Sequence, residues 1–72
     1  MPAWLPNDPK IQDLYSKCLG KEIYESQDGM KVIYHLNGDS FTFILEQDNF
    51  GYPVLTTILM NSEPYWKGGE WV

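Results

Sequence analysis

The chain has 72 residues and a formal net charge of −5, from five basic and ten acidic residues. This length predicts a single domain over residues 1–72, because the chain is too short to bury two hydrophobic cores. All five basic residues are Lys and they are scattered, which argues against direct nucleic-acid binding. The hydrophobic content of 43% is typical of a folded chain.

Cysteine and histidine content limits the chemistry further. Cys18 is the single cysteine, so no internal disulfide can form, and Cys18 with His35 does not make a zinc ligand set. The N-terminal residues lack the pattern of a signal peptide, and no segment has the ~20 apolar residues of a membrane helix. We therefore expect a cytoplasmic protein without cofactor, metal or membrane span.

A short helix is predicted near the N-terminus. Residues 1–7 contain two prolines and are expected to form an extended lead-in. Asp8 is a suitable N-cap and Pro9 a suitable first residue for a helix over 9–19, which Gly20 would end. The apolar positions of this helix share one face and are Ile11, Leu14, Tyr15, Cys18 and Leu19.

Antiparallel strands are predicted after the helix, at residues 21–26, 30–36, 40–47 and 54–60. The dipeptide Asn37–Gly38 is a strong signal for a two-residue hairpin turn. This turn places Tyr34 opposite Phe41 and Val32 opposite Phe43, so that one face of the hairpin is apolar. We expect the helix to cover that face.

The first hairpin has two possible registers. A two-residue turn at 28–29 opposes Glu25 to Val32, whereas a three-residue loop at 27–29 opposes Glu25 to Lys31. We favour the second register, because it pairs opposite charges across the strands.

The C-terminal part is predicted to end in a small hairpin. A loop at 48–53 and a turn at 61–64 flank the fourth strand. In the hairpin over 65–72, a turn at Gly68–Gly69 would place Trp66 opposite Trp71.

These elements predict an α+β fold, with an N-terminal helix packed on an antiparallel β-meander of four strands and a small C-terminal aromatic hairpin. The alternative is a small SH3-like or OB-like barrel with a leading helix. Strand 54–60 is apolar on both faces, so it should lie centrally or pair with a second chain. A homodimer through this strand is the expectation.

No catalytic constellation is specific enough to predict an enzyme. His35 would lie opposite Ser40 and near Asp39, but cross-strand neighbours rarely align a proton relay, and no oxyanion site is evident. The acidic residues mostly occupy turns, a helix cap and solvent-facing strand positions, which are structural uses. Cys18 lies in the apolar stripe of the helix and is expected to be an inert core residue.

The sequence contains more aromatic side chains than the predicted core can bury. Six of them lie in the lead-in, the loop and the terminal hairpin, and are the expected partner-binding residues: Tyr65, Trp66, Trp71, Phe50, Tyr52 and Trp4. We therefore expect a non-catalytic, acidic protein-interaction module that binds a larger protein partner with a basic surface, as an inhibitor or accessory subunit.

Two other functions are compatible with the sequence. The net charge of −5 would suit a phage- or mobile-element-encoded inhibitor that mimics nucleic acid. A ligand-binding domain would need a pocket formed between subunits, because so thin a fold has little room for one of its own.

Overall fold

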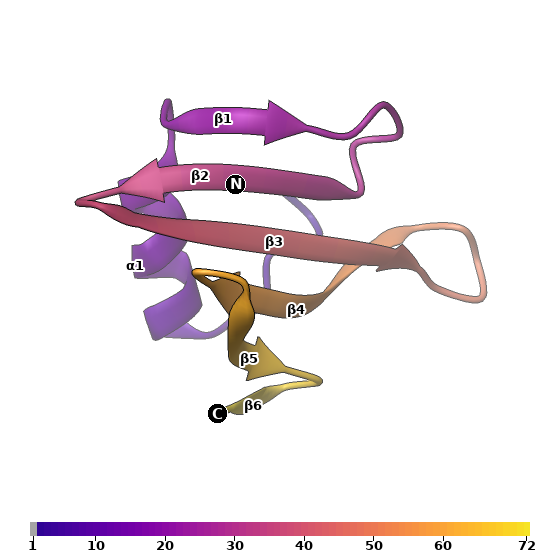
Figure 1. The fold of residues 1–72 in the computed structure, drawn as a ribbon. Helices are drawn as coiled ribbons and strands as arrows, with labels where there is room; N and C mark the ends of the chain where they lie inside the picture. Colours follow the sequence, from indigo (N-terminus) through magenta and orange to yellow (C-terminus); the bar gives the residue numbers. More distant parts are fainter. Residues whose placement is uncertain (1) are drawn as a thin grey trace.

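The computed structural model describes residues 2–72 and shows one short helix and a six-stranded antiparallel sheet (Figure 1). The elements are α1 (Pro9–Cys18), β1 (Glu22–Glu25), β2 (Lys31–Leu36), β3 (Asp39–Gln47), β4 (Pro53–Met60), β5 (Glu63–Lys67) and β6 (Glu70–Trp71). Strands adjacent in sequence are adjacent in the sheet, in the order β1-β2-β3-β4-β5-β6. The sheet is therefore an open meander and not the barrel given as the alternative.

The C-terminal hairpin is part of the main sheet, which has six strands where four and a separate hairpin were expected. The turn after β4 is shorter than the predicted turn at 61–64. Asn61 and Ser62 both have positive φ, of 51° and 70°, as a two-residue hairpin turn requires. Met60 consequently pairs with Glu63, and β5 continues directly alongside β4.

The central hairpin has the predicted register. Asn37 and Gly38 adopt positive φ values of 52° and 86°, and Tyr34 lies opposite Phe41 across the strands. Val32 likewise lies opposite Phe43. Local turn chemistry and the sorting of apolar side chains agree here, which confirms the prediction.

The first hairpin has the register that we did not favour. Glu25 lies opposite Val32, and the predicted pairing of Glu25 with Lys31 is wrong. The Ser26 N–H donates to the Lys31 carbonyl at 2.8 Å, and the Ser26 hydroxyl donates to the Asp28 carboxylate at 2.7 Å. Hydrogen bonds within the loop therefore fix this register, and they outweigh one exposed charge pair.

The helix begins as predicted and ends one residue earlier. The Asp8 side chain accepts a hydrogen bond from the Lys10 N–H at 2.9 Å, and Ile11 and Cys18 are fully buried. Leu19 was expected in the buried stripe but is exposed. The reason is that Leu19 has left helical geometry, with φ −57° and ψ 131°, so the periodicity no longer applies to it.

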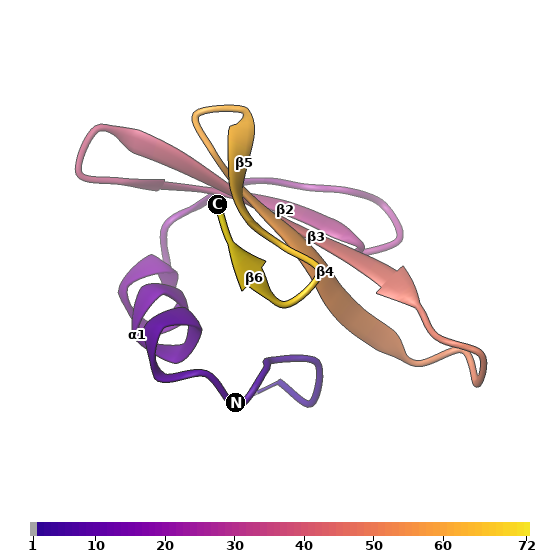
Figure 2. The same cartoon turned by 90° about the horizontal axis from the view of Figure 1, so that it is seen from below.

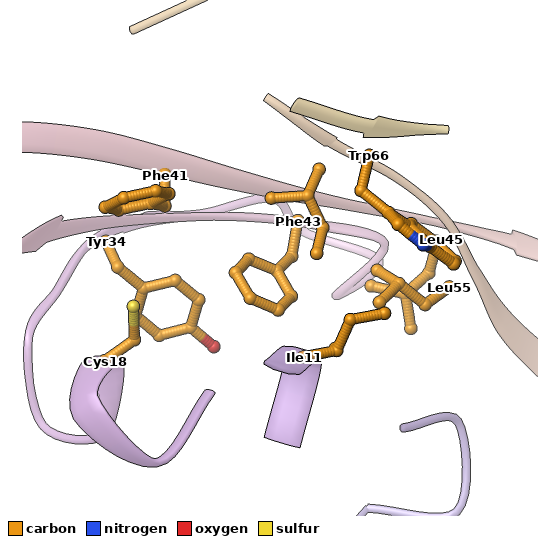
Figure 3. Packing of buried hydrophobic residues seen from close by; sticks show 9 residues of the cluster. Ile11, Cys18, Tyr34, Phe41, Phe43, Leu45, Leu55 and Trp66 are labelled. Atoms are coloured by element: carbon orange, nitrogen blue, oxygen red, sulfur yellow. The ribbon is translucent and has the colours of Figure 1, made fainter. Parts of the chain in front are cut away.

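The core lies between the sheet and the elements on one of its faces. Figure 2 shows α1 and the N-terminal segment on the same side of the twisted sheet. Figure 3 shows Cys18 reaching from the helix toward the Tyr34 ring, whereas Ile11 extends toward Leu55 and Leu45. The opposite face is covered by no other element of residues 2–72. The helix α1 has 10 residues, and no described helix is long and apolar enough to cross a membrane.

Strand β4 lies between β3 and β5, so its apolar composition is that of a central strand. Thr57 pairs with Lys67 on the β5 side, whereas Pro53–Leu55 extend beyond the reach of β5. The expected homodimer through this strand stays a prediction. Residues Pro53–Leu55 pair with β3 on one side and do not pair with β5 on the other, so a second chain has an edge to pair with there.

The same substitution at two sites tests where the core lies. Ile58 is 0% exposed, whereas Ile23 on the edge strand is 63% exposed. We expect Ile58→Val to lower the free energy of unfolding by about 0.5–1.5 kcal/mol, because a buried methylene is lost. Ile23→Val should change it by less than about 0.5 kcal/mol. Urea denaturation measures both values, and equal effects would contradict the assigned core.

Candidate functional site

The six aromatic residues expected to bind a partner are not all on the surface. Trp66 is 5% exposed and belongs to the core, opposite Ile58 of β4. Its indole Nε1 is buried and has no hydrogen-bond partner among the described residues. The expectation of an exposed contact residue is therefore wrong for Trp66. The bulge in β5 between its two pairing segments turns this side chain to the helix side.

Tyr65 and Trp71 are half-buried and pack the C-terminal hairpin against the core. Their ring centroids are 5.2 Å apart, and the Tyr65 ring lies 5.8 Å from that of Phe41. The Lys10 ammonium of α1 lies 4.4 Å from the Trp71 ring centroid, at cation–π distance. The predicted cross-strand pairing of Trp66 with Trp71 is confirmed.

Trp4 lies on a segment that folds back and is not extended as predicted. The Leu5 N–H donates to the Pro2 carbonyl at 3.2 Å, which closes a turn. This turn brings the Trp4 ring within 5.4 Å of Tyr15 and 6.4 Å of Phe43, measured between centroids. The proline-rich composition alone did not indicate the turn, because the burial of Trp4 depends on rings from distant elements. Met1 of the predicted lead-in lies outside the described residues.

Phe50 and Tyr52 are the aromatic residues that project furthest into solvent, with exposed fractions of 84% and 68%. Both belong to the connection between β3 and β4. The Asp48 carboxylate accepts hydrogen bonds from the N–H groups of Phe50 and Tyr52, each at 2.9 Å. The Asp48 N–H also donates to the Tyr52 carbonyl at 2.9 Å. We call residues 48–52 the aromatic loop, which holds two exposed rings on a hydrogen-bonded turn.

Two acidic residues, Glu46 and Asp48, lie at the β3 side of the aromatic loop. Between Lys31 and Lys67 the chain contains no Lys or Arg, and its four acidic residues there are Asp39, Glu46, Asp48 and Glu63. Glu46 and Asp48 lie at the end of β3 from which the loop projects. The strand pairing also brings two Lys residues toward this end of the sheet, because Lys31 pairs with Ile44 of β3 and Lys67 pairs with Thr57 of β4.

Asp39 and Ser40, which the sequence places near His35, form hydrogen bonds with Asn61. The Asp39 carboxylate accepts from the Asn61 side-chain amide at 3.0 Å, and the Ser40 N–H donates to the Asn61 side-chain oxygen at 3.0 Å. His35 is exposed on the strand opposite. Asn61 ties the two turns at this end of the sheet together, a role that depends on the tertiary pairing of β3 with β4.

Cys18 is buried between the helix and the sheet. Burial, reinforced by the nearby Glu22 carboxylate and opposed by Lys21, raises the pKa of its thiol from 9.0 to about 11. The folded state therefore holds the neutral thiol, which is the unreactive form.

This pKa shift predicts how stability depends on pH. The Cys18 thiol ionises first in the unfolded chain, so its stabilising contribution is complete below pH 9 and is lost as the pH rises toward about 11. We expect the stability advantage of the wild type over Cys18→Ala to shrink between about pH 9 and about pH 11 in urea denaturation. A constant advantage would show that the thiol titrates normally.

The role of Asp48 in the aromatic loop is testable by hydrogen exchange. Asp48→Ala removes the acceptor of two N–H groups, so the amides of Phe50 and Tyr52 should exchange about tenfold faster. Asp28→Ala is the matched control, because Asp28 accepts from the Met30 N–H in the β1–β2 loop. Unchanged exchange in Asp48→Ala would mean that the loop does not depend on this carboxylate.

Comparisons with known proteins do not identify a relative: no family model matches the chain, and no curated protein or solved structure is significantly similar to it. The functional proposal therefore depends on the surfaces described above.

Proposed function

We propose that the protein is a non-catalytic, cytoplasmic interaction module that binds a larger protein partner through its aromatic loop, as an inhibitor or accessory subunit. The observation that carries this proposal is the exposure of Phe50 and Tyr52, of 84% and 68%, on a turn that Asp48 holds in place. The other aromatic residues expected to bind are buried or half-buried in contacts with the rest of the chain.

Exposed rings on a fixed turn are suited to binding. Tyr and Trp dominate the few interface residues that carry most of the binding energy, and other aromatic residues are enriched at interfaces. A loop already held in one conformation loses little conformational entropy when it docks. The two hydrogen bonds that the Asp48 carboxylate accepts therefore support binding, although they add little to the stability of the core.

The charge distribution supports a partner with a basic surface. Asp48 belongs to the loop and Glu46 precedes it on β3, so the charged residues nearest to the two exposed rings in sequence are acidic and not basic. Complementary charge at the rim of an interface accelerates association and excludes acidic partners. Rim charges are screened by salt, so they should affect the rate of association more than the lifetime of the complex.

Removal of the two exposed rings tests the proposal. We expect the double variant Phe50→Ala/Tyr52→Ala to capture its partner from native cytosol at least tenfold more weakly than the wild type, with an unchanged urea midpoint. Ile23→Ala is the control, because it removes an exposed apolar side chain from the distant strand β1. Captured proteins are quantified by mass spectrometry, and equal capture by wild type and double variant would contradict the proposal.

Salt dependence separates this function from mimicry of nucleic acid. Binding through the aromatic loop should weaken only modestly with added salt, whereas binding by carboxylates in a basic groove should weaken steeply. A steep dependence, together with no effect of Phe50→Ala/Tyr52→Ala, would favour mimicry.

A second copy of the chain is the other partner that the sequence predicts. The free edge of Pro53–Leu55 adjoins the aromatic loop, so strand pairing there would bury both surfaces together. Light scattering on the wild type distinguishes a dimer from a monomer of 8.4 kDa.

A further inference from the structure

A cavity of about 280 Å³ lies on the helix side of the sheet, against strands β1, β2 and β3. Segments distant in sequence enclose it: the N-terminal turn, the helix and these three strands. The side chains that determine its chemistry are four aromatic rings and two carboxylates, from Trp4, Tyr15, Tyr34, Phe43, Glu22 and Glu25. We call this cavity the ring pocket. It does not include Phe50 or Tyr52.

The rings of the pocket meet at steep angles. The Trp4 and Tyr15 planes are at 88° with centroids 5.4 Å apart, and the Tyr34 and Phe43 planes are at 80° with centroids 5.3 Å apart. In each T-shaped pair the edge of one ring meets the face of the other, and these contacts hold the four rings that line the pocket in fixed relative orientations. Ring faces carry the negative part of the aromatic quadrupole and attract cations.

The charged groups of the pocket are also negative. Glu22 and Glu25 are exposed at its rim on β1, and no Lys lines the pocket. Burial first, and then the neighbouring groups Tyr15, Glu22, Cys18 and Glu25, together raise the pKa of the Tyr34 hydroxyl to about 12. Tyr34 is 4% exposed, so its ring is a fixed wall of the pocket.

We propose that the ring pocket binds an organic cation, the alkylammonium or guanidinium head group of a small amine or of a Lys or Arg side chain. Aromatic faces with carboxylates at the rim are the recurring chemistry for such cations. A hard divalent metal would instead require a shell of oxygen ligands. The volume of about 280 Å³ is near the lower end for ligand sites, which fits one head group and not a larger molecule.

Matched probes test the proposal. Choline and 3,3-dimethylbutan-1-ol have nearly the same shape, but only choline carries a positive charge. We expect choline to shift the NMR signals of the Trp4 indole and of the Glu22 and Tyr34 amides saturably, at constant ionic strength. The neutral alcohol should bind at least tenfold more weakly. Equal binding of the two probes would show that the pocket binds through apolar contacts without recognising the positive charge, and would overturn the proposal.

Two variants assign the interaction to this pocket. Glu22→Gln/Glu25→Gln retains the shape of both exposed side chains and should weaken choline binding at least fivefold. Trp71→Leu is the control, because its ring lies at the C-terminal hairpin beside Lys10, outside the pocket. Unchanged affinity in the double variant, or loss of binding in Trp71→Leu alone, would place the cation elsewhere and contradict the assignment.

A last comparison distinguishes the two sources of the cation. Butylguanidinium and choline represent free small organic cations, and blocked tripeptides with central Lys, trimethyl-Lys or Arg represent a partner protein. Tighter binding of a tripeptide would identify a protein side chain, whereas equal or weaker binding would identify a free small cation. Both results support cation recognition, and no saturable binding by any probe overturns it. Phe50→Ala/Tyr52→Ala should leave these affinities unchanged, so this proposal and that for the aromatic loop can fail separately.

Discussion

The burial of Phe43 is the constraint on which the rest of the structure depends. Its ring lies within 6.4 Å of those of Trp4, Tyr15 and Tyr34, which come from the N-terminal segment, the helix and the neighbouring strand. A chain of 72 residues has one short helix with which to cover its sheet, so only one face can be buried in this way. The ring contacts consequently hold the helix and the N-terminal turn on the same face.

This packing also separates two surfaces of different chemistry. The rings that hold the layers together leave a cavity bordered by Glu22 and Glu25, near one edge of the sheet. At the C-terminal end of β3, Asp48 fixes a turn that presents Phe50 and Tyr52 to solvent. The first surface suits one cationic group and the second suits an apolar patch on a protein, so a single partner could engage both or two partners could engage one each.

Two features encoded within a few residues were predicted correctly, whereas the register of the first hairpin, which is also local, was not. The helix cap at Asp8 and the hairpin at Asn37–Gly38 are local, and the structure contains both. The burial of Trp66 was missed, because it depends on β5 joining the main sheet after a turn that ends earlier than expected. The pocket beside Trp4 was missed for the same reason: its walls come from elements whose contacts no local pattern reveals. Phe50 and Tyr52 are exposed as expected, because their turn is also local, and their role in partner binding stays a prediction.

A double-mutant cycle between Trp4 and Phe43 tests the central claim most directly. If the two rings hold the N-terminal turn on the sheet, Trp4→Leu and Phe43→Leu should be coupled in their effects on the free energy of unfolding. The expected coupling is about 0.5–1.5 kcal/mol, the range measured for aromatic pairs beyond their burial. Effects that add within about 0.3 kcal/mol would show that the rings do not interact, and would contradict this account of the fold and of the ring pocket.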